Sequence, residues 1–282
     1  MPLSFRRRRE AESDPPEKEG WSSTLRFLLL LAFLAWAVRS LLFAPFHIPS
    51  TSMLPALYVG DYVVVSKWPY GYSRQSFPFR FPPFEGRVLA RLPKRGDVVV
   101  FRPPGARIDF VKRVIGLPGD TVEVRGGMLV LNGEAIAREP FGNFAIPVSP
   151  NSPCLVMPPA TPFIVRTERG ENCLYPTYLE RLPDGPVYRV IDQVDIPRFD
   201  DFPAVRVPEG HLFMLGDNRD QSLDSRFSPA EGGVGLVPIE SLVGRASSIF
   251  WSTDGSAVYW KPWTWFTALR ADRLGQRFRS VE

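Results

Sequence analysis

The sequence predicts a mainly β protein preceded by one membrane-spanning helix. Thirty prolines and 22 glycines among 282 residues are too many for long helices beyond an N-terminal apolar segment. Four Gly-Asp pairs lie beside apolar, largely β-branched runs such as "GDVVVF", which is the pattern of strands bounded by turns. The length allows two domains or one domain with a large insertion.

The first predicted element is a transmembrane anchor at residues 24–46. Its apolar part, Phe27 to Phe46, has about the twenty residues that a spanning helix needs. Arg39 interrupts the run near its outer end, where its aliphatic stem can reach the interface. Because the basic residues between Arg6 and Arg26 all precede the span, residues 1–23 are expected to be a cytoplasmic tail and the remainder to be exported.

A cleaved signal peptide is the alternative for this segment, with Ala35-Trp36-Ala37 as its small-x-small cleavage site. We favour the anchor because the apolar run continues past that point. Both interpretations place the bulk of the chain outside the cytoplasm. Cys154 and Cys173 fall in that exported part, where an oxidising compartment permits one disulfide between them, two free buried thiols being the alternative.

Strand signals predict a β core from residues 47–125 and 207–260. They include "DYVVVSK" and "GDVVVF" in the first segment and "HLFMLG" and "SLVGRASSIFWS" in the second. Between them, residues 126–206 begin with a meander and then become Pro-rich and loop-heavy. We expect this portion to be an inserted cap domain.

Two aromatic segments stand apart from the strand pattern. Residues 68–95 have too many prolines and aromatics for a helix, and contact with the bilayer interface or packing on the core fits equally well. The C-terminal tail, residues 261–282, follows several tryptophans and fits either a short interfacial helix or a helix docked on the domain.

Composition excludes several classes of function. The net charge is only +4 with both signs mixed, which lacks the concentrated basic surface of a nucleic-acid binder. Two histidines and two cysteines far apart show none of the close ligand spacings of zinc sites, so no metal is expected. No glycine-rich phosphate loop is present, and no organic cofactor is expected.

Three consecutive hydroxyl residues, Ser50, Thr51 and Ser52, open the stretch "STSMLPAL". A Ser-His-Asp triad would need His47, at the membrane edge, or His211, at the start of a strand, and neither is favoured. The other possible base is a lysine, which must be neutral to accept a proton. Burial among apolar groups lowers a lysine pKa by the several units that this requires.

Lys112 is the lysine best placed for this role, because apolar residues flank it in "DFVKRVIGLPGD". On a strand its neighbour Arg113 would point to the opposite face, into water. Lys67 competes, but the Trp-Pro-Tyr turn that follows it is expected to be exposed. From composition alone an exposed strand lysine is favoured, and each serine can equally begin a turn.

Three separated segments resemble the bacterial type I signal peptidases (leader peptidases), a family with a Ser/Lys dyad. "STSMLPAL" is similar to the nucleophile motif, "KRVIGLPGDTVEV" to the lysine motif, and "LFMLGDNRDQSLDSR" to the third signature. They occur in the family's order after an apolar anchor and span the exported domain. Phe110 departs from the pattern, where a tyrosine is common, and should only deepen the desolvation of Lys112.

The resemblance implies a coiled, partly open β-sheet catalytic core with an inserted cap domain. It implies removal of N-terminal signal peptides from exported preproteins, with cleavage after small-x-small (Ala-x-Ala) sites. The expected partners are preproteins and the phospholipid bilayer, with no nucleic acid, and a monomer is expected. The expected location is the bacterial inner (plasma) membrane, single-pass, with the catalytic domain on the extracytoplasmic (periplasmic) face.

The resemblance also assigns roles to the hydroxyl residues and the lysine. Ser52 would be the nucleophile and neutral Lys112 its general base. The Ser50 hydroxyl and the Ser52 backbone N–H would form the oxyanion hole, and Thr51 should point elsewhere.

Further residues are expected to support this site. Ser222 would orient the Lys112 amine, and Asp224 would pair with Arg226 to hold the loop. Small-residue specificity requires shallow apolar pockets that exclude bulk. The guessed pocket walls are Ile48, Met53, Val98, Val100 and Phe101.

Two other functions remain open at this point. One is a specialised Ser/Lys maturation protease for a single exported substrate, and the other is an inactive membrane-anchored peptide-binding module. A self-cleaving repressor-type protease is disfavoured by the anchor. Retention of both Ser52 and Lys112 counts against a pure binder, which has no need of a buried lysine.

Overall fold

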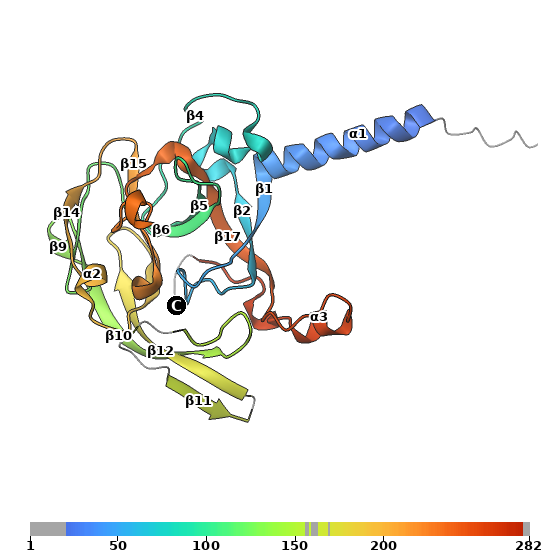
Figure 1. Ribbon diagram of the computed structural model, residues 1–282. Helices are drawn as coiled ribbons and strands as arrows, with labels where there is room; N and C mark the ends of the chain where they lie inside the picture. Colours follow the sequence, from blue (N-terminus) through green and yellow to red (C-terminus); the bar gives the residue numbers. More distant parts are fainter. Residues whose placement is uncertain (1–20, 156–157, 159–162, 169, 279–282) are drawn as a thin grey trace, which may run out of the picture. The chain divides into compact units, whose positions relative to one another are not determined.

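A computed structural model describes residues 21–155, 158, 163–168 and 170–278 of the chain (Figure 1). The fold is mainly β, as predicted, and its largest sheet is curled. The strands of this seven-stranded sheet follow the order β1-β2-β17-β5-β6-β15-β16, with antiparallel pairings throughout. Their bounds are β1 Phe43–His47, β2 Asp61–Ser66, β5 Val98–Phe101, β6 Phe110–Gly116, β15 His211–Leu215, β16 Val237–Pro238 and β17 Leu242–Ser252.

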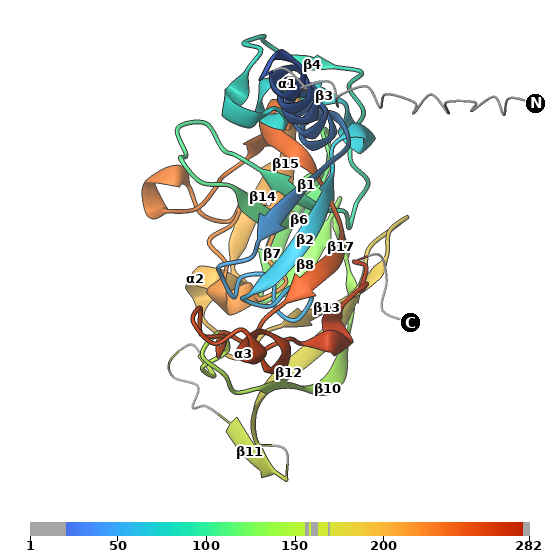
Figure 2. The same cartoon turned by 90° about the vertical axis from the view of Figure 1, so that its right-hand side faces the viewer.

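The smaller sheets come mostly from the segment that we expected to be an inserted cap. One contains β10 (Ala137–Pro147), β11 (Phe163–Thr167), β12 (Gly170–Arg181) and β13 (Val187–Ile191). Another contains β7 (Thr121–Arg125), β8 (Met128–Leu131), β9 (Glu134–Ala135) and β14 (Phe202–Arg206). A short ribbon pairs β3 (Tyr72–Ser73) with β4 (Arg87–Val88). Both views place β10, β11 and β12 at the end opposite β4 (Figures 1 and 2).

The main sheet shares one hydrophobic core with the strands of the segment 126–206. Ile115 and Phe213 of the main sheet pack in one buried cluster with Leu129, Tyr188 and Val190. Residues Val38–Glu282 accordingly form one compact unit, and the boundaries of the cap remain a prediction.

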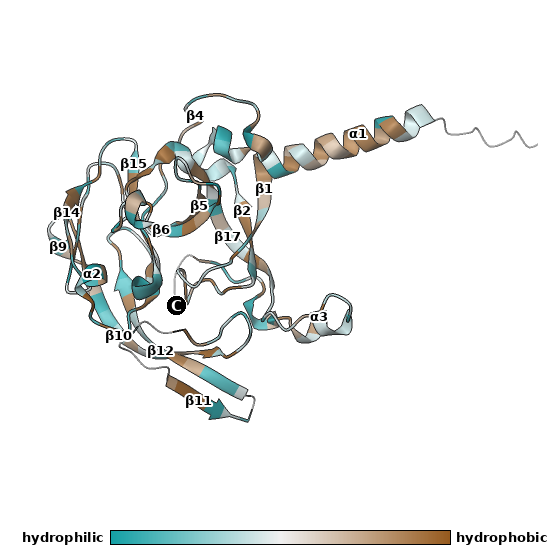
Figure 3. Cartoon of the chain, viewed as in Figure 1, coloured by the Kyte–Doolittle hydropathy of each residue, from teal (hydrophilic) through white to brown (hydrophobic). Residues whose placement is uncertain are grey.

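The apolar N-terminal helix differs from the prediction at its end. The helix α1 (Trp21–Ala37) continues as a π-helical stretch, Val38–Leu42, and the 22 residues are long and apolar enough to cross a membrane (Figure 3). The predicted helical end at residue 46 is wrong, because residues 43–47 form β1. Pro45 lacks the N–H that a helix interior needs, and an edge strand tolerates it.

The remaining described helices are short, as the proline content predicts. They are α2 (Pro197–Asp200), α3 (Trp263–Thr267) and single turns at Trp68–Tyr70, Arg74–Ser76, Pro78–Arg80, Arg219–Gln221, Pro229–Glu231, Ile239–Ser241 and Ala271–Arg273.

The two aromatic segments are each divided between core and surface. Tyr70 is buried in the core, whereas Phe79 and Leu89 of the same segment are exposed. In the tail, Arg273 is buried and donates to both carboxylate oxygens of Asp61, so this part is docked on the domain. The tryptophans and phenylalanine of α3 are exposed.

Candidate active site

The turn between β1 and β2 carries the three hydroxyl residues. Its two ends are joined because the Ile48 N–H donates to Asp61 and the Gly60 N–H donates to the Ile48 carbonyl. Ser52 is 8% exposed, and its Oγ lies 3.3 Å from the Oγ of the exposed Ser50. The nearly buried Ser52 hydroxyl therefore lies beside the exposed Ser50 hydroxyl, in a turn most of whose residues are buried.

A loop from the other end of the sequence fixes this turn. The Asn218 N–H donates to the Ser52 carbonyl (3.1 Å), and the Asn218 side chain donates to the Thr51 carbonyl (3.3 Å). The Thr51 hydroxyl donates to Gln221 (2.8 Å), so it is turned away from Ser52. The contribution of Gln221 was not predicted, because no local pattern in the sequence links it to Thr51.

Gly216 lets the loop approach the turn closely. A Cβ on Gly216 would overlap both the Ser222 hydroxyl and the Ser52 carbonyl oxygen. Only glycine fits between these groups without displacing one of them.

Lys112 lies on an interior strand of the main sheet, β6, opposite Val99 of β5. It is 3% exposed, and burial lowers its pKa from 10.5 to about 8; the Asp224 carboxylate partly opposes this shift, and the Arg226 guanidinium adds to it. On the other side of β6, Arg113 pairs with Leu215, the last residue of β15, and the chain then enters Gly216. The loop that holds Ser52 thus begins on the strand next to Lys112.

Ser222 is fully buried, but its hydroxyl does not make the predicted hydrogen bond to Lys112. Among the described residues the Ser222 Oγ has no hydrogen-bond partner. It lies instead over Gly216, in the space where a Cβ would be. Hydrogen bonds in substrate-free active sites are often long and form fully only in the complex.

The prediction that Arg113 would face water is wrong. Its side chain is 2% exposed and binds both carboxylate oxygens of Asp217, at 2.7 and 2.5 Å. It also donates to the Gly96 carbonyl and stacks on the ring of Tyr188. The alternation along β6 is as expected, but strand β13 covers the second face, so both faces are buried.

A second buried ion pair fixes the loop from within. Arg226 donates to both oxygens of Asp224, and Asp224 also accepts the Gly216 N–H at 3.0 Å. Burial alone would raise the pKa of Asp224, but the Arg226 guanidinium holds it below the usual value.

The Arg219 side chain forms a further buried pair that sequence reasoning missed. Arg219 binds Glu180 at 2.6 Å, and the Tyr188 hydroxyl donates to the same carboxylate. Glu180 and Tyr188 lie on β12 and β13, inside the segment whose pattern was weakest.

Lys67 is also buried, contrary to the expectation of an exposed turn. It is 4% exposed, and burial lowers its pKa to about 8. Strand β2, which ends one residue before Lys67, is separated from β6 by β17 and β5, or about 14 Å measured along the sheet. The charges nearest Lys67 include Asp109, whereas those nearest Lys112 belong to the loop that holds Ser52. Position, and not the pKa alone, distinguishes the two lysines.

The five guessed pocket residues are all buried, but the structure divides them. Four of them share one hydrophobic cluster: Ile48, Met53, Val98 and Val100. The fifth, Phe101, belongs to a different cluster. Because side chains alternate along β5, Phe101 cannot line the same wall as Val98 and Val100.

The disulfide between Cys154 and Cys173 lies beneath the serine turn. Both cysteines share a buried cluster with Leu54 and Tyr58, which follow Ser52 in the chain. His47 and His211 lie elsewhere, on β1 beside Tyr62 and on β15 beside Pro238.

A nearly buried serine hydroxyl, a second hydroxyl beside it and a buried lysine are the groups that a serine peptidase needs. The family model "Signal peptidase, peptidase S26" matches residues 21–251. The Signal peptidase I of Rickettsia conorii is 31% identical over 96% of both chains, and that of Rickettsia akari is 34% identical over 84% of this chain and 80% of its own. A solved signal peptidase I from Enterococcus faecalis is 24% identical and covers 56% of this chain and 98% of its own, with a TM-score of 0.29.

The chain therefore belongs to the signal peptidase family, peptidase S26. It is a serine endopeptidase that removes signal peptides, and the sequence resemblance is confirmed. The apolar helix that precedes the β unit is consistent with the membrane anchor of such an enzyme.

Proposed function

We propose that the enzyme cleaves exported preproteins with Ser52 as nucleophile and neutral Lys112 as general base. The observation that carries this proposal is the burial of Lys112, which lowers its pKa to about 8. At neutral pH a useful fraction of the amine is then unprotonated, whereas an exposed lysine would be almost wholly charged.

Each step of the proposed reaction balances without a cofactor. Ser52 Oγ attacks the scissile carbonyl while its proton passes to Lys112, and the protonated lysine then donates to the leaving amine. This leaves the signal peptide esterified to Ser52. Lys112 next takes a proton from water, the resulting hydroxide equivalent attacks the ester, and Ser52 regains its proton. Ser222 would orient the amine once substrate closes the site.

The Ser50 hydroxyl is proposed to complete an oxyanion hole with the Ser52 N–H. We expect Ser50→Ala to lower kcat by about 10²–10³-fold with little change in KM, because the donor acts only on the developing oxyanion. Ser50→Thr keeps a hydroxyl and should retain most activity. Thr51→Val is the matched control, since the Thr51 hydroxyl is bonded to Gln221. Full activity of Ser50→Ala would contradict this role.

Cleavage after small-x-small sites is proposed from the apolar cluster beside the serine turn. Ile48, Met53 and Val100 share this cluster, and its close packing would exclude larger substrate side chains. The assay is cleavage of a preprotein bearing an Ala-x-Ala site by the full chain in detergent. The expected product ends at that site, and replacing the last alanine by tryptophan should block cleavage.

The same assay separates the alternative functions. Binding of the preprotein without cleavage would favour the peptide-binding module. Cleavage of a single exported protein, with others left intact, would favour a specialised maturation protease.

We also propose a single-pass protein in the bacterial inner (plasma) membrane, with its N-terminus in the cytoplasm. The basic residues before the apolar helix support this orientation. The disulfide between Cys154 and Cys173 supports an oxidising, extracytoplasmic location for the catalytic unit.

A further inference from the structure

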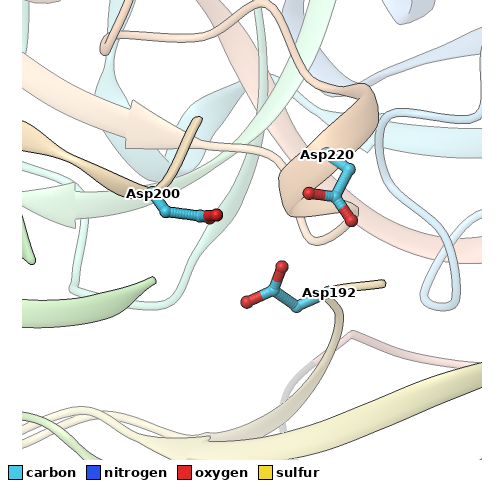
Figure 4. A group of neighbouring side chains, drawn as sticks. All are labelled: Asp192, Asp200 and Asp220. Atoms are coloured by element: carbon cyan, nitrogen blue, oxygen red, sulfur yellow. The ribbon is translucent and has the colours of Figure 1, made fainter. Parts of the chain in front are cut away.

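Three aspartates from separate elements converge behind the active-site loop. Asp192 follows β13, Asp200 ends α2, and Asp220 lies in the helical turn Arg219–Gln221. One oxygen from each side chain lies within 4.8 Å of the others (Figure 4). Asp220 is two residues from Ser222, so this cluster adjoins the loop that holds Ser52.

Each of these carboxylates is fixed through its Oδ2 atom. The donors are Arg138 to Asp192 (2.5 Å), the Ile196 N–H to Asp200 (2.5 Å) and the Gln193 N–H to Asp220 (2.6 Å). The side chains therefore have defined orientations.

Within the described part of the chain, the other oxygen of each carboxylate accepts no hydrogen bond. The Oδ1 atoms of Asp192, Asp200 and Asp220 are all buried and lack a hydrogen bond within the described residues. Asp220 is 0% exposed and Asp200 is 5% exposed, so water is largely excluded from them. A buried carboxylate oxygen without a donor is unfavourable, and a native protein normally supplies a partner.

The charge of the cluster is also incompletely balanced. In the described part of the chain, Arg138 is the one cation in an ion pair with any of the three, and it binds Asp192. Arg226 lies nearby but donates to the Phe199 carbonyl. Burial, with repulsion from Asp192 and Asp200, raises the pKa of Asp220 to about 6.

We propose that Asp192, Asp200 and Asp220 bind a divalent cation, calcium by preference. All three ligands are hard oxygen donors, which suit calcium or magnesium. Calcium binds oxygen ligands at about 2.3–2.6 Å in a flexible geometry, whereas magnesium requires about 2.0–2.1 Å and a nearly octahedral arrangement. Three oxygens that lie within 4.8 Å of one another can reach a calcium ion with a smaller inward movement than magnesium would require. The ion would join β13, α2 and the loop of Ser222, without contact with the reacting atoms.

The test is thermal unfolding of the full chain in detergent, first freed of metal with EDTA. Calcium at about 10 mM, against sodium chloride of equal ionic strength, should raise the Tm by about 3–10 °C for a Kd of about 10⁻⁴–10⁻³ M. Magnesium should give a smaller rise. The readout needs no substrate, so it is independent of the proposed catalytic mechanism.

Asp200→Asn and Asp220→Asn test the ligands, because asparagine keeps an acceptor for the backbone N–H. Both variants should lose the calcium response and melt above the parent in EDTA, since one repelling charge is gone. Asp195→Asn, at an exposed position in the same segment, should keep the response.

Two results would overturn the proposal. One is that calcium does not raise the Tm of the parent, whereas lowering the pH from 7 to 5.5 does. That result would show that the three carboxylates share a proton and do not bind a cation. The other is a calcium response of the same size in the parent and in both asparagine variants.

Discussion

Lys112→Met is expected to lower kcat/KM for a preprotein by about 10³–10⁴-fold while the protein stays folded. Methionine fills a similar volume on β6 but cannot accept the proton of Ser52. Burial lowers the pKa of Lys112 from 10.5 to about 8, so the folded state disfavours the charged amine. The folded pKa is below the unfolded one, so this penalty is complete below pH 8 and disappears as the pH rises towards 10.5. Unfolding by urea should therefore show Lys112→Met to be more stable at pH 7, by about 3 kcal/mol.

Lys67→Met is the matched control, because Lys67 is equally buried and its pKa is also about 8. It follows β2, which lies three places from β6 in the sheet order. We expect a similar gain in stability and activity within a few-fold of the parent. Loss of activity in Lys67→Met, with Lys112→Met fully active, would transfer the role of base to Lys67.

Arg113→Met is expected to lower the free energy of unfolding by about 3–5 kcal/mol. It leaves the Asp217 carboxylate, which is 1% exposed, without its bidentate partner. The next residue, Asn218, holds the Ser52 carbonyl, so the remaining folded enzyme should also be less active. Urea unfolding measures the first effect, and kcat/KM below the unfolding transition measures the second.

Arg125→Met removes an arginine from an exposed pair and provides the comparison. Arg125 is 73% exposed and binds Glu123, so its loss should lower stability by less than about 1 kcal/mol. Equal losses for the two variants would contradict the structural importance of the Arg113–Asp217 pair.

The sequence allowed the strands and the three family segments to be predicted because their signals are local. The family resemblance, and not the local pattern, predicted a buried Lys112, and alternation along the strand then placed Arg113 on the opposite face. The same alternation could not show that Tyr188, on a strand more than seventy residues away, covers Arg113 on the other face. Burial of the second face depends on long-range packing that no local period encodes.

Other features of the site escaped prediction for the same physical reason. The Asn218 and Gln221 contacts with Thr51 join segments 167 and 170 residues apart. Asp192, Asp200 and Asp220 are spread over three elements, and the spacing of histidines and cysteines gave no sign of them. The end of the apolar helix was misplaced because residues 43–46 are as apolar as the helix that precedes them.

The most direct test of the Ser52–Lys112 mechanism is the pH dependence of kcat/KM between pH 6 and 9. The enzyme used is Lys67→Met, because it lacks the other lysine whose pKa is lowered to about 8 and leaves only Lys112. Because only the neutral amine accepts a proton, the rate should rise about tenfold per pH unit at low pH and level off above about 8. A rate that is constant over this range, or that levels off near 6.5 as for a histidine base, would contradict the account.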